Sequence, residues 1–371
     1  MDKWAADTFS FNHPGTKVLT RDIQMISDAE ITDAFGGASP DIVLGGPPCQ
    51  GYSICCKNAG DPTDPKNSLF TEFLRVARIL SPEFVLMENV PNIERARTHS
   101  GELVIDIIKE ELRKLGYQVA HRVLEATNYG VPQIRKRLFI IGSLQGLTDP
   151  FPEATHSTKK DSLFTNRLKP CPTLWDSISD LPPLKAGEGA EEQDYCLPPV
   201  SAYQKQLRKD CQRLCNHKAM NHTSRMVERF ASMSWGQSVS DVAEHLRPFR
   251  RNGNGELSGK AYDQNNRRMH PQKPCHTIPA SFYANFVHPY QSRNFTPREG
   301  ARIQSFPDQY VFKGKPTVIS QKLLSREGRI EEKHLCQYAQ IGNAVPPLMA
   351  QAIAENLMRQ HRRQFVYEST R

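Results

Sequence analysis

Apolar residues between positions 17 and 142 recur in two alternating patterns. The run Asp-Ile-Val-Leu-Gly at 41–45 is typical of a short buried strand that ends in a glycine–proline turn, whereas residues 68–80 carry apolar side chains at helical spacing. The same criteria predict strands near Val18 and at 84–87, 119–124 and 138–142, and a helix at 102–115. Strands that alternate with crossover helices predict an α/β fold built on a largely parallel, doubly wound sheet.

The pattern changes after Pro150. Residues 151–265 hold many prolines and polar turns with little sustained periodicity, which predicts a smaller, irregular domain. Within it, residues 201–251 carry ten Lys or Arg against four acidic residues. This basic segment is either an ordinary solvated surface or a set of phosphate contacts. A last amphipathic helix is predicted over 344–362.

Composition narrows the class of protein. The 371 residues are 38% hydrophobic and 24% charged, with a net charge of +8 and a pI near 9.0. These values suit a soluble globular protein and are compatible with a polyanionic partner. No run approaches the ~18 apolar residues of a membrane span, and the first twenty residues lack a signal-peptide core, so we expect no association with a membrane.

Cysteine usage indicates the compartment. The nine cysteines are an odd number at irregular spacings without a CxxC pair, which favours a reducing, intracellular compartment over a disulfide framework. Cys211 and Cys215 with His217 and His222 match no common metal-site spacing. We therefore expect no bound metal.

One cysteine follows the 41–45 strand directly, in the run Gly-Gly-Pro-Pro-Cys49-Gln-Gly-Tyr-Ser. Ligands of a doubly wound sheet bind beyond the carboxyl ends of its strands, where this loop is expected to lie. Two prolines stiffen the chain before the thiol, and glycines on both sides allow a substrate to approach closely. The alternative, a buried structural cysteine, has little need of such a lead-in. We therefore predict that Cys49 is a nucleophile.

An acid and two arginines are expected at the same edge of the sheet. Glu88 ends the next strand, where it is either a catalytic acid or a cap or salt-bridge partner. Arg135 and Arg137 are two residues apart at the start of the last strand, so their side chains should point the same way. A thiolate, an acid and a guanidinium together suit nucleophilic addition to an electron-poor ring, in which the acid protonates a ring nitrogen and an arginine holds the ring carbonyl.

These motifs resemble the DNA (cytosine-5) methyltransferase family, in the family's order and over about residues 1–360. The loop around Cys49 resembles its nucleophile motif, Glu88-Asn-Val its acid motif, and Gln133-x-Arg135-x-Arg137 its arginine motif. Residues 267–277 resemble the segment that organises target recognition, and Gln-Ile-Gly-Asn-Ala-Val-Pro-Pro at 340–347 resembles the final motif, which returns to the cofactor pocket.

The resemblance implies a domain organisation. A Rossmann-like, S-adenosylmethionine-dependent methyltransferase domain, with catalytic and cofactor residues, would cover 1–150. A target-recognition region would cover 151–265. A hinge segment and the C-terminal return to the catalytic domain would cover 266–371.

The resemblance also implies the reaction. Cys49 would add to C6 of a cytosine flipped out of double-stranded DNA, Glu88 would act at N3, and Arg137 would hold O2 and steady Glu88, with Arg135 supporting the loop. C5 would take the methyl group of S-adenosylmethionine at a specific DNA sequence, as in the modification half of a restriction system. The residues expected to bind the cofactor are Asp22, Ile23, Pro47, Pro48, Asn343 and Val345.

The beginning of the family pattern has no counterpart here. Family members open with a strand, a glycine-rich loop and a second strand that ends in a ribose-binding glutamate, and residues 2–14 resemble the helix after that glutamate. The run at 33–37, Asp-Ala-Phe-Gly-Gly, is interpreted as an ordinary turn. We expect an open sheet edge and weak cofactor binding by this chain alone. A late start codon, a truncated gene, or a partner polypeptide that supplies the missing motif would each account for this pattern.

Two other functions stay open at this stage. One is methylation of a tRNA cytosine; the residues after the nucleophile, Tyr52 and Ser53, and the sizeable variable region favour DNA instead. The other is a truncated, inactive homologue that binds DNA or serves as a subunit for a partner. The expected location is cytoplasm or nucleoid in a prokaryote and the nucleus in a eukaryote.

Overall fold

The computed structural model describes residues 2–48, 69–98, 101–146, 148–159, 168–249, 255–257, 266–317, 321–329 and 333–368. Its largest sheet has four strands in the order β1 (Ile42–Gly45), β2 (Phe84–Asn89), β5 (Lys136–Ser143) and β3 (Gln118–Glu125). β1 and β2 are parallel, whereas β5 runs antiparallel to both β2 and β3. The strands predicted at 41–45, 84–87, 119–124 and 138–142 are confirmed.

The expectation of a largely parallel sheet is wrong for β5. β3 and β5 are joined by residues 126–135, which form a short 3₁₀ helix, a turn and the two-residue strand β4 (Gln133–Ile134). A parallel pair needs a longer crossover connection that contains a helix, whereas a short connection returns the chain beside the strand it has just left. The sheet is therefore mixed.

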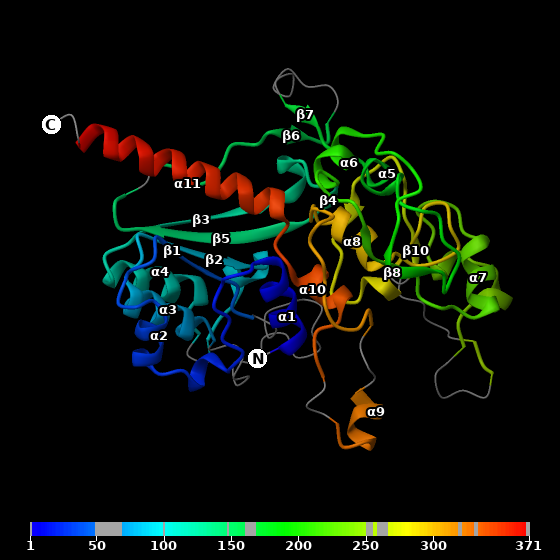
Figure 1. Cartoon of the computed structure of the whole chain (residues 1–371), viewed down its shortest axis with the longest axis horizontal. Helices are drawn as coiled ribbons and strands as arrows, with labels where there is room; N and C mark the ends of the chain where they lie inside the picture. Colours follow the sequence, from blue (N-terminus) through cyan, green and yellow to red (C-terminus); the bar gives the residue numbers. More distant parts are fainter. Residues whose placement is uncertain are drawn as a thin grey trace.

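Helices cover both faces of the sheet, as a doubly wound architecture requires (Figure 1). α2 (Asp28–Ala34), α3 (Leu69–Leu80) and α4 (Val104–Lys114) lie on one face, and α11 (Pro347–Glu368) lies on the other. α11 begins three residues later than predicted, because a proline is well tolerated in the first turn of a helix and poorly inside it.

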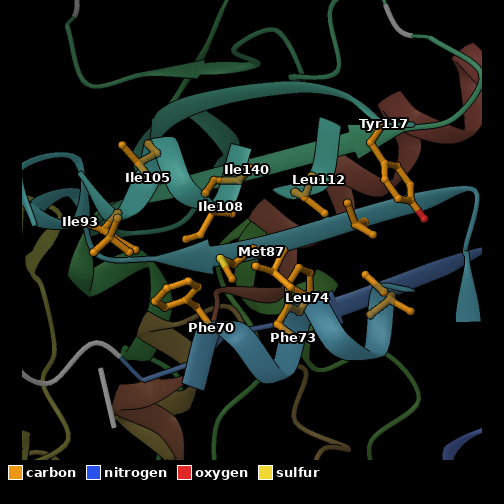
Figure 2. Packing of buried hydrophobic residues seen from close by; sticks show 14 of the residues in the cluster. Phe70, Phe73, Leu74, Met87, Ile93, Ile105, Ile108, Leu112, Tyr117 and Ile140 are labelled. Atoms are coloured by element: carbon orange, nitrogen blue, oxygen red, sulfur yellow. The ribbon is translucent and has the colours of Figure 1, made fainter. Parts of the chain in front are cut away.

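Alternate residues of each strand supply two separate cores. Met87 and Ile140 pack with Phe73 on the face that α3 and α4 cover (Figure 2). Phe84, three residues earlier on β2, packs instead with Met349 of α11. The sheet therefore forms a layer between two apolar clusters, which holds the carboxyl ends of β1 and β2 in fixed positions.

A second, irregular domain lies beside the sheet (Figure 1). Its core includes the fully buried rings of Phe282, Phe295 and Tyr338, and it draws on residues from 174 to 341. The remaining elements of the described chain are α1 (Lys3–Asn12), η1 (Ile23–Met25), η4 (Pro91–Arg95), η5 (Ala126–Tyr129), β4 (Gln133–Ile134), β6 (His156–Ser157), β7 (Lys169–Pro170), α5 (Leu174–Ile178), β8 (Gly189–Gln193), α6 (Ala202–Leu207), β9 (Leu214–Lys218), α7 (Ser224–Ala231), η6 (Val239–Asp241), η7 (Glu244–Leu246), β10 (Arg267–Arg268), β11 (Cys275–His276), η8 (Phe282–Ala284), β12 (Phe286–Val287), α8 (Pro297–Ile303), α9 (Gln321–Arg326) and α10 (Gln337–Asn343).

The strand predicted near Val18 is wrong, because residues 16–20 form no regular element. Two apolar residues followed by Thr-Arg-Asp are too few to bury a strand, and Leu19 is 42% exposed. The helix before it, α1, packs on the second domain rather than on the sheet. Asn12 of α1 exchanges two hydrogen bonds with the backbone of Val311, at 2.8 and 2.9 Å.

Candidate active site

Glu88 and Arg137 meet because β2 and β5 are neighbours in the sheet. Glu88 stands opposite Phe139 in the antiparallel pair, and Arg137, two residues before Phe139, points to the same side. Arg137 Nε lies 2.9 Å from Glu88 Oε1, and the two side chains are 15% and 17% exposed. The sequence places these groups 49 positions apart, and the sheet brings them into an ion pair.

The surroundings of Glu88 adjust its acidity. Burial raises the pKa of the Glu88 carboxyl, and the positive charges of Arg137 and Arg135 oppose that rise. Burial also lowers the pKa of the Arg137 guanidinium, against the charge and hydrogen bond of Glu88. A carboxyl with a raised pKa keeps its proton closer to neutral pH, which is what a general acid needs.

The turn after β1 runs beside this pair. Asn89 Nδ2 donates to the Pro47 carbonyl at 3.1 Å, which ties the turn to the end of β2. A Cβ on Gly46 would stand 3.5 Å from Glu88 Oε2, so the turn passes directly alongside the carboxylate. Cys49 lies outside the described residues. The chain that leads to it begins next to Glu88.

Arg135 differs from Arg137 in its contacts. Its guanidinium is 1% exposed and donates to three backbone carbonyls, those of Ile278 at 3.1 Å, Gly342 at 2.9 Å and Ala344 at 3.1 Å. Burial lowers the pKa of Arg135 to about 9. Among the described residues, Arg137 forms the ion pair with Glu88, while Arg135 joins the strand to two other segments of the chain.

Comparison with known proteins identifies the family. A family model described as C-5 cytosine-specific DNA methylase matches residues 1–359. The chain belongs to the C-5 cytosine-specific DNA methylase family. The Glu88–Arg137 pair and the turn that leads to Cys49 both lie within the matched residues.

Two relatives are type II methyltransferases. The chain is 46% identical to M.DdeI of Desulfomicrobium norvegicum over 363 residues, which cover 96% of this chain and 81% of that protein. It is 34% identical to M1.HphI of Haemophilus parahaemolyticus, over 95% of this chain and 77% of that protein. Among solved structures, a protein described as a DNA modification methyltransferase encoded within an E. coli prophage has the same fold, with a TM-score of 0.69, 22% identity, and coverage of 97% of this chain and 91% of that one.

The residues expected to bind the methyl donor of a DNA methylase fall in three places: Asp22 and Ile23 before α2, Pro47 and Pro48 after β1, and Asn343 at the end of α10 with Val345 just after it. Asp22 caps η1 by accepting from the Gln24 N–H at 3.1 Å, and Ile23 is 37% exposed. Asn343 is exposed, whereas Val345 is half-buried beside the α11 core.

The two histidines that follow Cys215, His217 and His222, have structural partners. Both ring nitrogens of His217 are engaged, with Thr296 Oγ1 and with the Pro182 carbonyl, each at 2.9 Å. His222 Nε2 accepts from the Asn294 N–H at 3.3 Å. In the part of the chain that the structure describes, no group of three or more His, Cys, Asp or Glu residues is placed to hold a metal ion, and no helix is both long and apolar enough to span a membrane.

Burial of His217 makes the stability of this methylase pH-dependent. Burial lowers the pKa of His217 to about 4. The unfolded chain binds this proton more tightly, so the contribution is complete above pH 6.5 and is lost as the pH falls toward 4. We expect the free energy of unfolding in urea to fall over that range by up to about 1.4 kcal/mol per pH unit from this group. His217→Gln should flatten that slope, whereas His245→Gln, at an exposed position, should keep it; equal slopes in both variants would contradict the assignment.

The segment from Thr296 to Gln304 was not predicted from the sequence. Thr296 and Glu299 form a reciprocal capping box with Pro297 in the first turn of α8, a signature that the sequence displays. The side chain of Glu299 also pairs with Arg293, and Gln304 ends the helix fully buried. The capping box predicts where the helix begins, but the partners of its buried side chains come from distant parts of the chain.

Proposed function

We propose that this protein transfers a methyl group to C5 of cytosine at a specific sequence of double-stranded DNA, through a covalent bond between Cys49 and C6. The observation that supports it most is the largely buried ion pair between Glu88 and Arg137 beside the turn that leads to Cys49. Membership of the C-5 cytosine-specific DNA methylase family supplies the substrate.

The side chains divide the chemistry. The Cys49 thiolate forms a bond to C6, and the electron pair of the C5–C6 double bond moves through the ring toward N3, where Glu88 supplies a proton. Arg137 keeps the carboxyl of Glu88 directed at the ring and can donate to the O2 of the base. Once C5 carries the methyl group, the C5 proton leaves to a base such as water, and its bonding electrons re-form the C5–C6 double bond. The S–C6 bond breaks in the same step, which regenerates the thiolate, and N3 returns its proton to Glu88.

The family's reaction uses S-adenosylmethionine, which supplies an electrophilic methyl group on a sulfonium sulfur. The chain offers groups that fit this molecule: an exposed apolar side chain at Ile23, a carboxylate at Asp22 and an amide at Asn343. Apolar surface suits the adenine ring, and the carboxylate and amide suit its polar edge. The backbone at Pro47 and Pro48 and the side chain of Val345 would complete the site.

The open side of β1 fits a partner polypeptide that adds a strand. Among the residues that the structure describes, β1 is the last strand at one side of the sheet, and Leu44 on it is 65% exposed. An edge strand presents unpaired backbone donors and acceptors, and burying an exposed leucine there would be favourable. We include in the proposal that a strand–loop–strand segment pairs with β1 and strengthens binding of the methyl donor.

A surface from β4 toward Trp235 is the proposed DNA-facing wall. Ile134, 42% exposed, is paired with His276 across β4 and β11. Burial lowers the pKa of His276, and the charge of nearby Arg267 adds to that effect. Arg267 Nη1 donates to the Gly236 carbonyl at 2.8 Å. This run of residues joins segment 133–137, which carries Arg135 and Arg137, to the exposed ring of Trp235. We interpret the irregular domain around Trp235 as part of the target-recognition region.

Trp235 is expected to contact DNA. Its ring is 47% exposed and stands 5.2 Å from the His270 ring, a combination of aromatic and basic side chains that suits nucleic acid. We expect Trp235→Ala to raise the KM for duplex DNA by about tenfold, from loss of one aromatic contact, with the KM for S-adenosylmethionine unchanged. Trp235→Phe should retain most of the affinity. Equal changes in both KM values, or none, would exclude this contact.

The proposed function is tested by transfer of a labelled methyl group from S-adenosylmethionine to unmethylated duplex DNA, with tRNA as the competing substrate. We expect label in 5-methylcytosine of DNA at one recurrent sequence. The assay is run with the chain alone and with a family strand–loop–strand segment fused ahead of residue 1, which should increase activity. Label in tRNA alone would replace the proposal with RNA methylation, and no transfer in either form would favour a non-catalytic protein.

A further inference from the structure

Helix α8 ends in a glutamine whose buried side chain connects two parts of the candidate site. Gln304 Nε2 donates to the Ile341 carbonyl at 2.9 Å, and Gln304 Oε1 accepts from Gln133 Nε2 at 2.9 Å. Neither glutamine has exposed surface. Gln133 lies on β4, two residues before Arg135, and Ile341 lies in the last turn of α10, which ends at Asn343. The amide of Gln304 therefore joins segment 133–137, which carries Arg135 and Arg137, to residues 341–344 at the end of α10, where Asn343 is expected to contact the cofactor.

Further hydrogen bonds close this connection into a ring. Gln133 Oε1 accepts from the Ile278 N–H at 2.9 Å, and Arg135 donates to the Ile278 carbonyl at 3.1 Å. Arg135 also donates to the Ala344 carbonyl at 3.1 Å, and Gln304 Nε2 approaches the same oxygen at 3.4 Å. The ring passes from Gln133 through Gln304, Ala344, Arg135 and Ile278 back to Gln133. Of its members, Gln304 is the one at the end of α8.

The next residue holds the other end of the same turn. Ser305 has a φ of 67°, in the left-handed region that residues other than glycine rarely adopt. Its Oγ accepts from the Leu348 N–H at 3.1 Å, which satisfies a donor in the first turn of α11. Gln304 and Ser305 thus form hydrogen bonds with the two ends of segment 341–348. This segment carries Asn343 and Val345, which are expected to contact the cofactor.

We propose that Gln304 is a positioning residue for methyl transfer: its amide fixes the turn at 341–344 relative to the strand that carries Arg137. The inference rests on the proposed function, since Gln304 acts through Gln133 and Ala344 rather than on the substrate. Reacting groups must be held within about 0.5 Å of productive geometry. A fully buried amide suits that purpose, because either of its hydrogen bonds, once broken, leaves an unsatisfied polar group.

A matched control exists in the same domain. Gln204 has no exposed surface, like Gln304. Its Nε2 donates to Ser179 Oγ at 2.7 Å and its Oε1 accepts from the Val200 N–H at 2.7 Å. These partners lie in the neighbourhood of α5 and α6. Gln204 therefore makes equivalent hydrogen bonds without joining segment 133–137 to residues 341–344.

Three variants separate positioning from general stability. Gln304→Leu removes both arms of the amide, Gln304→Glu keeps the oxygen that accepts from Gln133 but loses the donor to the 341–344 turn, and Gln204→Leu is the control. Amide hydrogen exchange is measured in segments 131–137 and 340–346, with α4 as the internal reference. The KM for S-adenosylmethionine and kcat are measured on the same preparations.

We expect Gln304→Leu to speed exchange in both segments by about tenfold, the effect of one lost buried hydrogen bond, with α4 unchanged. Gln304→Glu should speed exchange in 340–346 alone and raise the KM for S-adenosylmethionine by about tenfold, with a smaller loss in kcat. Gln204→Leu should lower stability while leaving exchange in both segments and the KM at parent values.

Equal acceleration of both segments in Gln304→Leu and Gln204→Leu would overturn the proposal, as would an unchanged KM in a Gln304→Glu enzyme that methylates DNA. Amide hydrogen exchange is measured without any methyl transfer taking place. If the parent chain transfers no methyl group, the proposed function fails and exchange still decides whether Gln304 couples the two segments. If Gln304→Leu does not fold, Gln304→Glu carries the comparison.

Discussion

Replacing Cys49 with serine is expected to slow methyl transfer to DNA by at least about a thousandfold. A free thiol has a pKa of about 8.5 and supplies some thiolate near neutral pH, whereas a serine hydroxyl stays protonated and cannot add to C6 at a comparable rate. The measurement is the initial rate of label transfer to duplex DNA at saturating S-adenosylmethionine. Binding of DNA, followed by gel retardation, should persist because the hydroxyl has nearly the size of the thiol.

The matched control is Cys196→Ser, at an exposed position in the second domain. It should retain the parent rate, because the proposed chemistry uses one thiol. Parent-like turnover in Cys49→Ser would contradict covalent catalysis by this residue. If Cys49→Ser lost both its rate and its binding of DNA, a damaged loop would explain the loss. If the variant still binds DNA, that explanation is excluded.

Glu88→Gln should reduce kcat by about a hundred- to ten-thousandfold, the usual contribution of a positioned general acid. The amide can still accept from Arg137, so the pair keeps its shape while the proton for N3 is lost. The pH dependence should change as well. Burial raises the pKa of Glu88, and the acid is protonated below that pKa, so the parent rate should fall as the pH rises above it. The glutamine variant should lack that dependence.

Glu94→Gln is the matched control, since Glu94 is 44% exposed and lies on η4 just after β2. It should keep both the parent rate and the parent pH profile. Identical pH profiles for the parent and Glu88→Gln enzymes would show that Glu88 does not deliver the proton. A uniform rise in the KM for DNA without loss of kcat would assign Glu88 to binding rather than to proton transfer.

The parts of the fold that depend on local pattern could be predicted from sequence. The apolar runs at 41–45 and 84–87 became parallel neighbours, and the residues that follow them, Gly46 and Glu88, lie beside each other. The position of a strand end can be predicted because the alternation of side chains and the turn residues that follow depend on a few adjacent positions.

The rest depends on contacts between distant parts of the chain. The direction of β5 follows from the length of the connection before it, and the strand pattern is the same in either direction. Arg135 and Arg137 have the same local context, yet one pairs with Glu88 and the other with three carbonyls supplied by residues 278–344. The role of Gln304 could not be predicted from its neighbours in the sequence, because its partner Gln133 is 171 positions away.

The central claim, that Cys49 bonds to C6 of cytosine beside Glu88 and Arg137, is tested most directly with duplex DNA whose cytosines carry fluorine at C5. Fluorine cannot leave C5 as a proton does, so the S–C6 bond should persist after methyl transfer. We expect a denaturation-resistant protein–DNA adduct that forms only with S-adenosylmethionine and maps to Cys49 by mass spectrometry of the peptide. Release of the fluorinated DNA without an adduct, or an adduct at another residue, from a preparation that methylates ordinary DNA would contradict the account.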